Sequence, residues 1–337
     1  MSTFSKKVIN WQEKYGRNNL PWQTKNPYHV WISEIMLQQT QVYTVIPYFQ
    51  KFIKNFPKIE VLAKAEEEEI LALWSGLGYY TRARNILKTA IILKKEFDSF
   101  LPNTYEDLIS LPGIGASTAG AILTLAFEKP GIILDGNVKR VLLRYSGDRS
   151  PINNTKTLKN LTKFAKNLLP KKDFRAYSQG MMDLGSTLCV PKNPLCKKCP
   201  VSKNCQTFEF NYQDEIPFKT ASKPKKEKEI NWFFIFSKNK VLLKRNKNKG
   251  IWQNLWLFPE KDILSKDNLC LLEKKESLPI FTHNLSHQKL NISTLKYSIE
   301  NKDRLKIDRS HSLWVSKSDS VKMGIPKPIK ELINNYL

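Results

Sequence analysis

Four of the five cysteines lie in one short stretch with the spacing C-x6-C-x2-C-x5-C: Cys189, Cys196, Cys199 and Cys205. A zinc ribbon usually draws two C-x2-C pairs from separate hairpins, whereas this stretch is local and has one such pair. The spacing therefore favours one 4Fe–4S cluster, which takes four Cys ligands. Structural zinc remains an alternative. Disulfides are a weaker one, because the N-terminus has no signal-peptide core and a reducing interior disfavours them.

Glu34 is the one carboxylate in the apolar stretch 30–40. Helical spacing places Val30, Trp31 and Leu37 beside it. Loss of water around a carboxylate raises its pKa, so Glu34 is expected to be a protonated acid near neutral pH. The alternative is a solvated glutamate on the outer face of a helix.

Asp135 stands where the apolar run 132–134 meets an expected helix start. Helix N–H groups and the helix dipole would keep this carboxylate ionised, although an ordinary N-cap explains the residue equally well. A protonated Glu34 and an ionised Asp135 would form a general acid and a cation stabiliser. That pair suits cleavage of a bond between an anomeric carbon and its leaving group.

Two glycine-containing stretches could contact nucleic acid. In the stretch 111–120, Gly113 and Gly115 allow positive φ and a close approach of backbone N–H groups to a phosphate. The alternative is a plain turn between helices. In the stretch 76–85, Tyr79 and its neighbouring aromatic could wedge between bases while arginines hold phosphates. A core tyrosine pair is the alternative there.

The composition supports an anionic partner. The chain has 337 residues and a net charge of +24, and the cysteine stretch also carries Lys192, Lys197, Lys198 and Lys203. No long apolar run or basic amphipathic helix favours a membrane, so a nucleic acid fits better. We expect a cytoplasmic protein that associates with the nucleoid when it acts. The lysines suggest that the cysteine stretch, with its metal centre, serves to present positive charge rather than to transfer electrons.

The elements that must position these residues fall into two patterns. Residues 5–207 have helical periodicity, with Asn26-Pro27 as an expected helix start. Short β-prone runs at 232–236 and 241–243 follow, residues 290–295 alternate with period two, and 331–336 suits a closing helix. The sequence predicts a mostly α domain at 1–207, a basic linker at 208–228, and an α+β domain at 229–337.

Together these motifs resemble the MutY-type adenine-DNA glycosylases, in the helix-hairpin-helix superfamily that includes endonuclease III. The resemblance covers nearly the whole chain. Its main carriers are Leu20-Pro21-Trp22, the stretches 33–42 and 76–80, the Gly113–Gly115 hairpin, the stretches 134–140 and 181–185, and the cysteine loop.

The resemblance implies excision of adenine from duplex DNA, where it is mispaired with 8-oxoguanine or guanine, after the adenine is flipped into a pocket. Glu34 matches the general acid and Asp135 the carboxylate that stabilises the sugar cation. Asn137 would orient Asp135 or the attacking water.

Further matches concern binding. The adenine pocket would include Arg17, Trp22 and Gln179, and the DNA-contacting residues would be Gln38, Gln39, Tyr79, Gly113, Gly115 and Ser117. Gln38 and Tyr79 match side chains that enter the base stack. One 4Fe–4S cluster and a monomeric protein are also expected.

Ser117 separates two kinds of relative. Endonuclease III-like enzymes carry a hairpin lysine there that attacks the sugar. With Ser117 the resemblance implies a monofunctional glycosylase that leaves the backbone intact, and Lys139 is a conceivable weak substitute. A bifunctional glycosylase/lyase is one alternative function, and a non-enzymatic DNA-binding module is another.

The second domain resembles a Nudix-like module through the Trp-rich stretch 250–259, without a glutamate-rich catalytic helix after it. Its implied role is recognition of 8-oxoguanine. The family's Phe-Ser-His loop matches Leu285, Ser286 and His287. Ser286 and His287 keep the polar contacts, whereas Leu285 replaces the aromatic residue.

Overall fold

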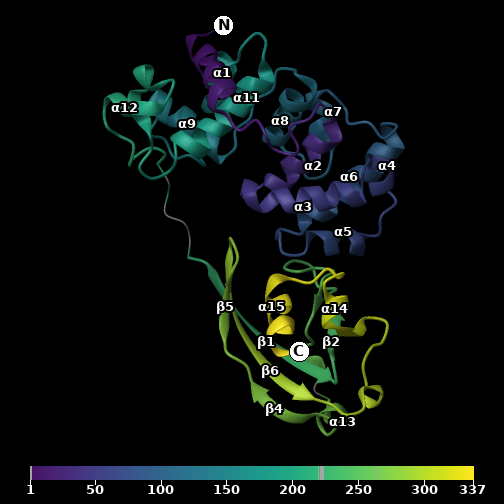
Figure 1. The fold of residues 1–337 in the computed structure, drawn as a ribbon. Coiled ribbons are helices and arrows are strands. Elements are labelled where there is room, and N and C mark those ends of the chain that lie inside the picture. Colours follow the sequence, from purple (N-terminus) through teal and green to yellow (C-terminus); the bar gives the residue numbers. More distant parts are fainter. Residues whose placement is uncertain (1, 219, 221–223, 264) are drawn as a thin grey trace. The chain divides into compact units, whose positions relative to one another are not determined.

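The computed structural model describes residues 2–218, 220, 224–263 and 265–337, so residues 219 and 221–223 of the predicted linker lie outside it. Its residues form two compact units. The first comprises Met1–Lys64 and Lys88–Ala221, and the second comprises Ala65–Leu87 and Ser222–Leu337 (Figure 1). In the described part of the chain, no helix is both long and apolar enough to cross a membrane.

The first unit is helical, as predicted. Its helices are α1 (Thr3–Tyr15), α2 (Pro27–Leu37), α3 (Val42–Asn55), α4 (Ile59–Leu62), the later part of α6 (Thr81–Glu96), α7 (Tyr105–Ser110), α8 (Ala116–Phe127), α9 (Gly136–Ser146), α10 (Thr155–Leu168), α11 (Phe174–Asp183) and α12 (Gln206–Glu209). A π-helical turn, Leu184–Leu188, continues α11, and the short 3-10 turns Cys196–Lys198 and Ser202–Asn204 lie in the cysteine loop.

Local sequence explains where α2 and α9 begin. The Asn26 side chain accepts the Tyr28 N–H at 3.0 Å, and Pro27 stands at the first helical position, as the sequence predicted. Asp135 caps α9 in the same way, accepting the Val138 N–H at 2.7 Å. These caps fix the helices that carry the two candidate catalytic carboxylates.

Tertiary packing brings these helices together. Helix α2 packs against α3 and α8, and α11 packs against α1, α8 and α9. Gly120 of α8 permits a close approach, because a Cβ there would lie 2.1 Å from the Ile132 carbonyl oxygen. The segment that leads to Asp135 therefore lies directly on α8. A core of buried side chains, including Val8, Leu143 and Leu184, supports this arrangement.

The second unit is α+β, as predicted. It contains α5 (Glu67–Trp74), the start of α6, β1 (Lys226–Ser237), β2 (Lys240–Arg245), β3 (Trp256–Leu257), α13 (Lys266–Leu269), β4 (Glu273–Ser277), β5 (Phe281–Asn284), β6 (Gln288–Ser298), β7 (Ser312–Ser316), α14 (Lys317–Ser320) and α15 (Lys327–Tyr336), with 3-10 turns at Lys261–Ile263 and Lys302–Arg304. The strand order is β3-β2-β1-β6-β4, with β5 on β6 and β7 on β2.

Strands β1 and β2 form a hairpin in which Ser237 pairs with Lys240, and β1 runs parallel to β6. Strand β1 starts at Lys226, inside the predicted linker, because its first residues already pair with β6. Leu290, Ile292 and Thr294 of β6 are buried in alternation, as the period-two pattern predicted.

Residues 65–87 belong to the second unit through specific contacts. Ser75 donates to the Ile325 carbonyl oxygen at 2.6 Å. Glu68 accepts the indole N–H of Trp256 at 2.7 Å. Sequence patterns do not report such pairings, since the partners are far apart along the chain.

Candidate active site and cysteine loop

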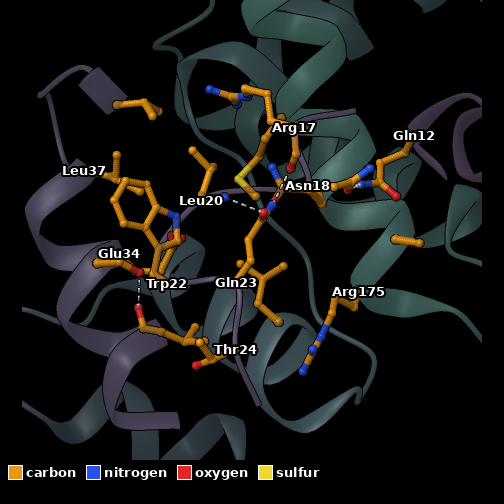
Figure 2. A pocket seen from close by; sticks show the side chains of 17 residues that line it. Gln12, Arg17, Asn18, Leu20, Trp22, Gln23, Thr24, Glu34, Leu37 and Arg175 are labelled. Atoms are coloured by element: carbon orange, nitrogen blue, oxygen red, sulfur yellow. Dashed lines mark hydrogen bonds between the residues drawn. The ribbon is translucent and has the colours of Figure 1, made fainter. Parts of the chain in front are cut away.

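A pocket of about 230 Å³ opens beside α2 in the first unit. Its walls include Arg17, Trp22, Val30, Glu34, Leu37 and Gln179 (Figure 2). Trp22 and Val30 are buried, so the pocket offers an apolar wall next to a few polar groups. Cavities of this kind are typical of small-molecule or nucleobase sites.

Glu34 combines a place in this pocket with an unusual pKa. Burial and, to a smaller extent, the nearby negative charge of Asp135 together raise the pKa of the Glu34 carboxyl to about 7. Trp31 and Ile35, its neighbours on α2, are almost completely buried. A carboxyl with this pKa holds a proton for much of the time at neutral pH and can donate it.

Asp135 meets a different environment. Burial raises the pKa of Asp135, but the backbone N–H groups of Val138 and Asn137 and the charge of Arg140 oppose this rise. The Asn137 amide also donates to the second carboxylate oxygen at 3.5 Å. Burial outweighs these donors, so the pKa of Asp135 stays above its usual value; the donors still favour its charged form, whereas Glu34 is surrounded mainly by apolar groups.

Arg140 connects this carboxylate group to the cysteine loop. It lies one turn after Asp135 on α9, and its Nη2 donates to Asn137 Oδ1 at 2.8 Å. Its Nε donates to the Cys189 carbonyl oxygen at 2.7 Å. Sequence analysis did not single out Arg140. Its basic character on a helix next to the candidate site was the one available signal.

The two glycines of the hairpin adopt different backbone conformations. Gly113 adopts φ +81°, which favours glycine, but Gly115 is extended at φ −92° and is the N-cap of α8. The positive φ that glycine allows is therefore used at Gly113, whereas Gly115 takes the extended conformation of a helix N-cap. A Cβ at Gly115 would meet no atom within 4 Å, so the backbone there remains open to a ligand.

Hydrogen bonds connect this hairpin to Gln38, at the end of α2, and to Leu134, the residue before Asp135. Gln38 donates to the Gly113 carbonyl oxygen at 3.3 Å and to Thr118 Oγ1 at 3.2 Å. The Ser117 hydroxyl accepts the N–H of Leu134, the residue before Asp135, at 3.1 Å. Gln39, next to Gln38, holds a left-handed backbone at φ +58°. Such conformations cost energy and cluster at functional sites.

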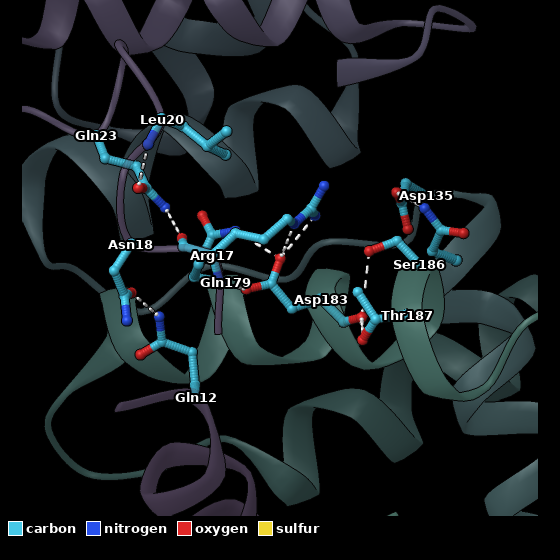
Figure 3. A network of polar contacts seen from close by, with 11 residues as sticks. Gln12, Arg17, Asn18, Leu20, Gln23, Asp135, Gln179, Asp183, Ser186 and Thr187 are labelled. Carbon is cyan, nitrogen blue, oxygen red and sulfur yellow. Dashed lines mark hydrogen bonds and ion pairs between the residues drawn. The ribbon is translucent and has the colours of Figure 1, made fainter. Parts of the chain in front are cut away.

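A polar network forms another wall of the pocket (Figure 3). Asp183, which is fully buried, accepts the Arg17 backbone N–H at 2.9 Å and the Arg17 Nε at 2.7 Å, and pairs with Arg17 Nη2 at 2.6 Å. Gln179 Nε2 donates to the same carboxylate at 2.9 Å. Sequence analysis matched Arg17 and Gln179 to a pocket but gave Asp183 no role. Arg175, which also lines the pocket, was missed too.

The four cysteines of the loop line a single cavity with Arg144 and Gln213. Burial raises the pKa of the Cys199 thiol to about 12, so its thiolate form needs a nearby positive charge. Within the described ranges, no three His, Cys, Asp or Glu side chains are grouped to hold one metal ion. Four Cys side chains around one cavity are the ligand set of either an iron–sulfur cluster or a zinc ion.

Arg144 holds this loop in place. Its guanidinium donates to the carbonyl oxygens of Val190 at 2.8 Å and Gln213 at 2.7 Å, and it approaches the Cys189 Sγ at 3.6 Å. An arginine in this position neutralises negative charge on the cysteines. The donor set and its surroundings are therefore suited to an anionic thiolate cluster.

In the second unit, the Leu285–His287 loop joins β5 to β6. The Ser286 and Tyr79 hydroxyl groups are hydrogen-bonded to each other. Both residues line a cavity of about 750 Å³, together with His287, Trp252 and His283. Tyr79 has φ +49°. This unit therefore brings the predicted tyrosine and the predicted loop to the same cavity, and adds Trp252 and His283, which sequence analysis had not assigned to a site.

The helical fold is that of the base excision DNA repair glycosylases of the helix-hairpin-helix class. Residues 32–170 match the model of the HhH-GPD superfamily of base excision DNA repair proteins, and residues 231–335 match the NUDIX domain. The predicted Nudix-like module is thereby confirmed.

The chain belongs to the adenine DNA glycosylase family. It is 43% identical to the adenine DNA glycosylase of Buchnera aphidicola subsp. Baizongia pistaciae, over 98% of this chain and 95% of that protein. It is 36% identical to the adenine DNA glycosylase of Homo sapiens, over 64% of this chain and 41% of that protein. The protein is accordingly a hydrolase of N-glycosyl bonds, as its resemblance implied.

Solved structures agree with the fold of the helical part. A thermostable thymine-DNA glycosylase is 30% identical with a TM-score of 0.57, covering 61% of this chain and 95% of that one. An endonuclease III in a non-covalent DNA complex is 22% identical with a TM-score of 0.54, covering 63% of this chain and 100% of that one. The latter likeness concerns the fold alone.

Proposed function

We propose that the protein removes adenine paired with 8-oxoguanine, or with guanine, from duplex DNA and leaves the DNA backbone intact. The observation that carries this proposal is the pairing of Glu34, whose pKa is raised to about 7, with the donor-held carboxylate of Asp135. The pocket beside Glu34 offers an apolar wall and polar groups to a flipped base.

In the proposed reaction, Glu34 gives its proton to a ring nitrogen of adenine. The bond between the base and C1′ then breaks, and its electron pair leaves with the neutral base. The Asp135 carboxylate stabilises the positive charge that develops on the sugar. Water adds to C1′ and loses a proton, for which the Glu34 carboxylate is an acceptor. Asn137, which donates to Asp135 at 3.5 Å, orients that carboxylate or the water.

We further propose that the helical unit grips DNA at the hairpin of Gly113, Gly115 and Ser117. The open backbone at Gly115 and the N-terminus of α8 support phosphate binding there. Gln38, the C-cap of α2, and Tyr79 are proposed to enter the base stack, and Gln39 is proposed to contact the DNA. All of the proposed catalytic residues belong to one chain, so a monomer is sufficient for the reaction. We propose that it acts on DNA in the cytoplasm.

Cys189, Cys196, Cys199 and Cys205 are proposed to hold one 4Fe–4S cluster, which would supply structural order and a fixed surface for the loop lysines. Cys199→Ser removes one of four ligands and is expected to lower iron content and thermal stability. Elemental analysis and visible absorbance measure this directly. Zinc in place of iron in the wild-type protein would contradict the cluster assignment.

The second unit is proposed to read the base opposite the adenine. Support comes from the cavity that Tyr79, Ser286 and His287 line, which offers hydroxyl and imidazole groups to a base edge. Leu285 can supply only an apolar contact. Recognition by hydrogen bonds would allow the protein to distinguish 8-oxoguanine from thymine opposite adenine.

The decisive experiment is single-turnover incubation of the full chain with a duplex that contains one adenine opposite 8-oxoguanine. We expect release of free adenine and strand breaks only after treatment with alkali. Equal strand breakage without alkali would support the bifunctional glycosylase/lyase instead. Tight binding with no adenine release would support a non-enzymatic DNA-binding module.

A further inference from the structure

Asp183 is a fully buried carboxylate that contacts two pocket residues at once. Arg17 and Gln179 both line the candidate adenine pocket, and both donate to Asp183 (Figure 3). The side chain of Asp183 has no exposed surface, and that of Arg17 is 31% exposed. Such a buried anion needs several donors to balance its lost hydration. The three donors of Arg17 and the one of Gln179 provide them.

This contact decides which atom Gln179 shows to the pocket. A carboxylate can only accept hydrogen bonds, so the Gln179 amide must point its Nε2 toward Asp183. Its Oε1 then remains for the pocket, and it has no hydrogen-bond partner among the residues described. Gln179 is itself 7% exposed, so an idle amide oxygen here has little water to satisfy it. The pocket consequently offers a fixed acceptor.

The same carboxylate orients the neighbouring donor. Asp183 accepts a hydrogen bond from Arg17 Nε and forms an ion pair with Arg17 Nη2. Among the described residues, none accepts a hydrogen bond from Arg17 Nη1. The Gln23 amide donates to the Arg17 carbonyl oxygen and holds the backbone from the other side. The pocket thus presents an acceptor from Gln179 and a donor from Arg17, both set by one anion.

We propose that Asp183 is a positioning residue that makes the pocket select a 6-amino purine over a 6-oxo purine. Adenine carries an amino donor beside a ring-nitrogen acceptor, whereas guanine carries an oxygen acceptor at the same carbon. The amino group fits the Gln179 oxygen. A 6-oxo group would place two acceptors against each other, and buried unpaired groups are costly. The inference rests on the proposed function, because it assigns the base selectivity of that same pocket.

The test compares Asp183→Asn with wild-type full-length protein. The variant amide has a donor of its own, so the Gln179 amide can turn and show its Nε2 to the pocket. Single-turnover excision is measured on duplexes with adenine or hypoxanthine opposite the same base. We expect the adenine-to-hypoxanthine rate ratio to fall by about tenfold or more. A purely structural role would lower both rates and leave their ratio unchanged.

Two further variants sharpen the comparison. Gln179→Leu removes the acceptor and is expected to lower the ratio similarly, and adding Asp183→Asn to it should lower the ratio little more. Asp173→Asn makes the same chemical change at the exposed start of α11 and should match wild type. Circular dichroism and iron content check the fold of each variant. If Asp183→Asn alone does not fold, the same comparison is made in an Arg17→Met background, which removes the charged partner.

The outcomes separate this inference from the proposed function. No excision of adenine by the wild-type protein would refute the proposed function itself. Excision of adenine with a rate ratio that Asp183→Asn leaves unchanged, alone or in the Arg17→Met background, would overturn the role of Asp183 and leave the proposed function standing. A lower ratio in Asp183→Asn that Gln179→Leu does not reproduce would also overturn it, because the effect would not pass through Gln179.

Discussion

Arg140 donates through Nη2 to Asn137 Oδ1 at 2.8 Å and through Nε to the Cys189 carbonyl oxygen at 2.7 Å. One guanidinium therefore holds both the amide beside Asp135 and the first residue of the cysteine loop. Burial lowers the pKa of Arg140. The guanidinium donates from several nitrogens in one plane, so it can hold both partners at once, and a single ammonium group cannot reproduce this geometry.

Arg140→Lys should weaken both sites together. We expect excision to slow by about tenfold or more, because partners behind a reactive group commonly contribute that much. Iron content should fall in the same variant. Arg149→Lys, at an exposed ion pair with Glu215, is the matched control. A variant with normal iron and a normal rate would show that Arg140 is not needed for either site.

The raised pKa of Glu34 predicts the pH dependence of excision. The protonated form of Glu34 donates, so the single-turnover rate should fall about tenfold per unit above a pH of about 7, and it should also fall at acidic pH where Asp135 becomes protonated. Glu34→Gln should lower the rate by about 10²–10⁴-fold and abolish the decline toward high pH. Glu13→Gln, on an exposed part of α1, is the control. A decline toward high pH that begins near pH 4 would mean that Glu34 is not the titrating acid.

Gly120→Ala should destabilise the helical unit. A Cβ there would lie 2.1 Å from the Ile132 carbonyl oxygen, so α8 or the adjoining segment must move. Overpacking of this kind costs about 1–3 kcal/mol. Gly115→Ala is the matched control, since its Cβ would meet nothing within 4 Å. Urea unfolding followed by circular dichroism measures both, and equal free energies of unfolding would contradict the close approach.

Ser286→Ala should reduce lesion preference in the full-length protein. It removes the hydroxyl that is hydrogen-bonded to Tyr79. The rate ratio between adenine opposite 8-oxoguanine and adenine opposite guanine is expected to fall about two- to tenfold, the value of one hydrogen bond. His287→Ala should act similarly, and His311→Ala, at another exposed turn of the same unit, should not. Unchanged ratios in both loop variants would remove this loop from lesion recognition.

Ser117→Lys should add sugar chemistry to the hairpin. Ser117 accepts the Leu134 N–H at 3.1 Å, next to Asp135 in the chain. A lysine amine there could attack C1′ of the sugar and displace the base; opening of the sugar ring, with the ring oxygen leaving C1′ as a hydroxyl group, then gives a Schiff base. Borohydride should then trap a covalent protein–DNA adduct that the wild-type protein does not give. Absence of any adduct, with adenine excision retained, would place residue 117 out of reach of the sugar.

The local features of this fold were predictable from the sequence. The Asn26-Pro27 start of α2, the Asp135 cap of α9 and the alternation in β6 each depend on neighbouring residues, and each is present. The glycine-rich pattern did not distinguish the left-handed turn residue, Gly113, from the helix N-cap, Gly115.

Long-range features were not predictable. Asp183 and Arg17 are far apart in the sequence, and nothing in the stretch around Asp183 indicates that its carboxylate orients a pocket. The contact between Ser75 and Ile325 is likewise a product of tertiary structure. Residue types suggested which side chains could react, but the partners that set their charge and orientation required the folded chain.

The second unit is built from two segments that are far apart in the sequence, and this affects the order in which the protein can fold during synthesis. All residues of the first unit have been made once the ribosome has passed residue 221, whereas the contacts of residues 65–87 with 222–337, such as that of Ser75 with Ile325, can form only later. Chains fold domain by domain as they emerge, and unpaired segments are then open to misassembly. Synthesis therefore completes the residues of the helical unit before the second unit can assemble with residues 65–87.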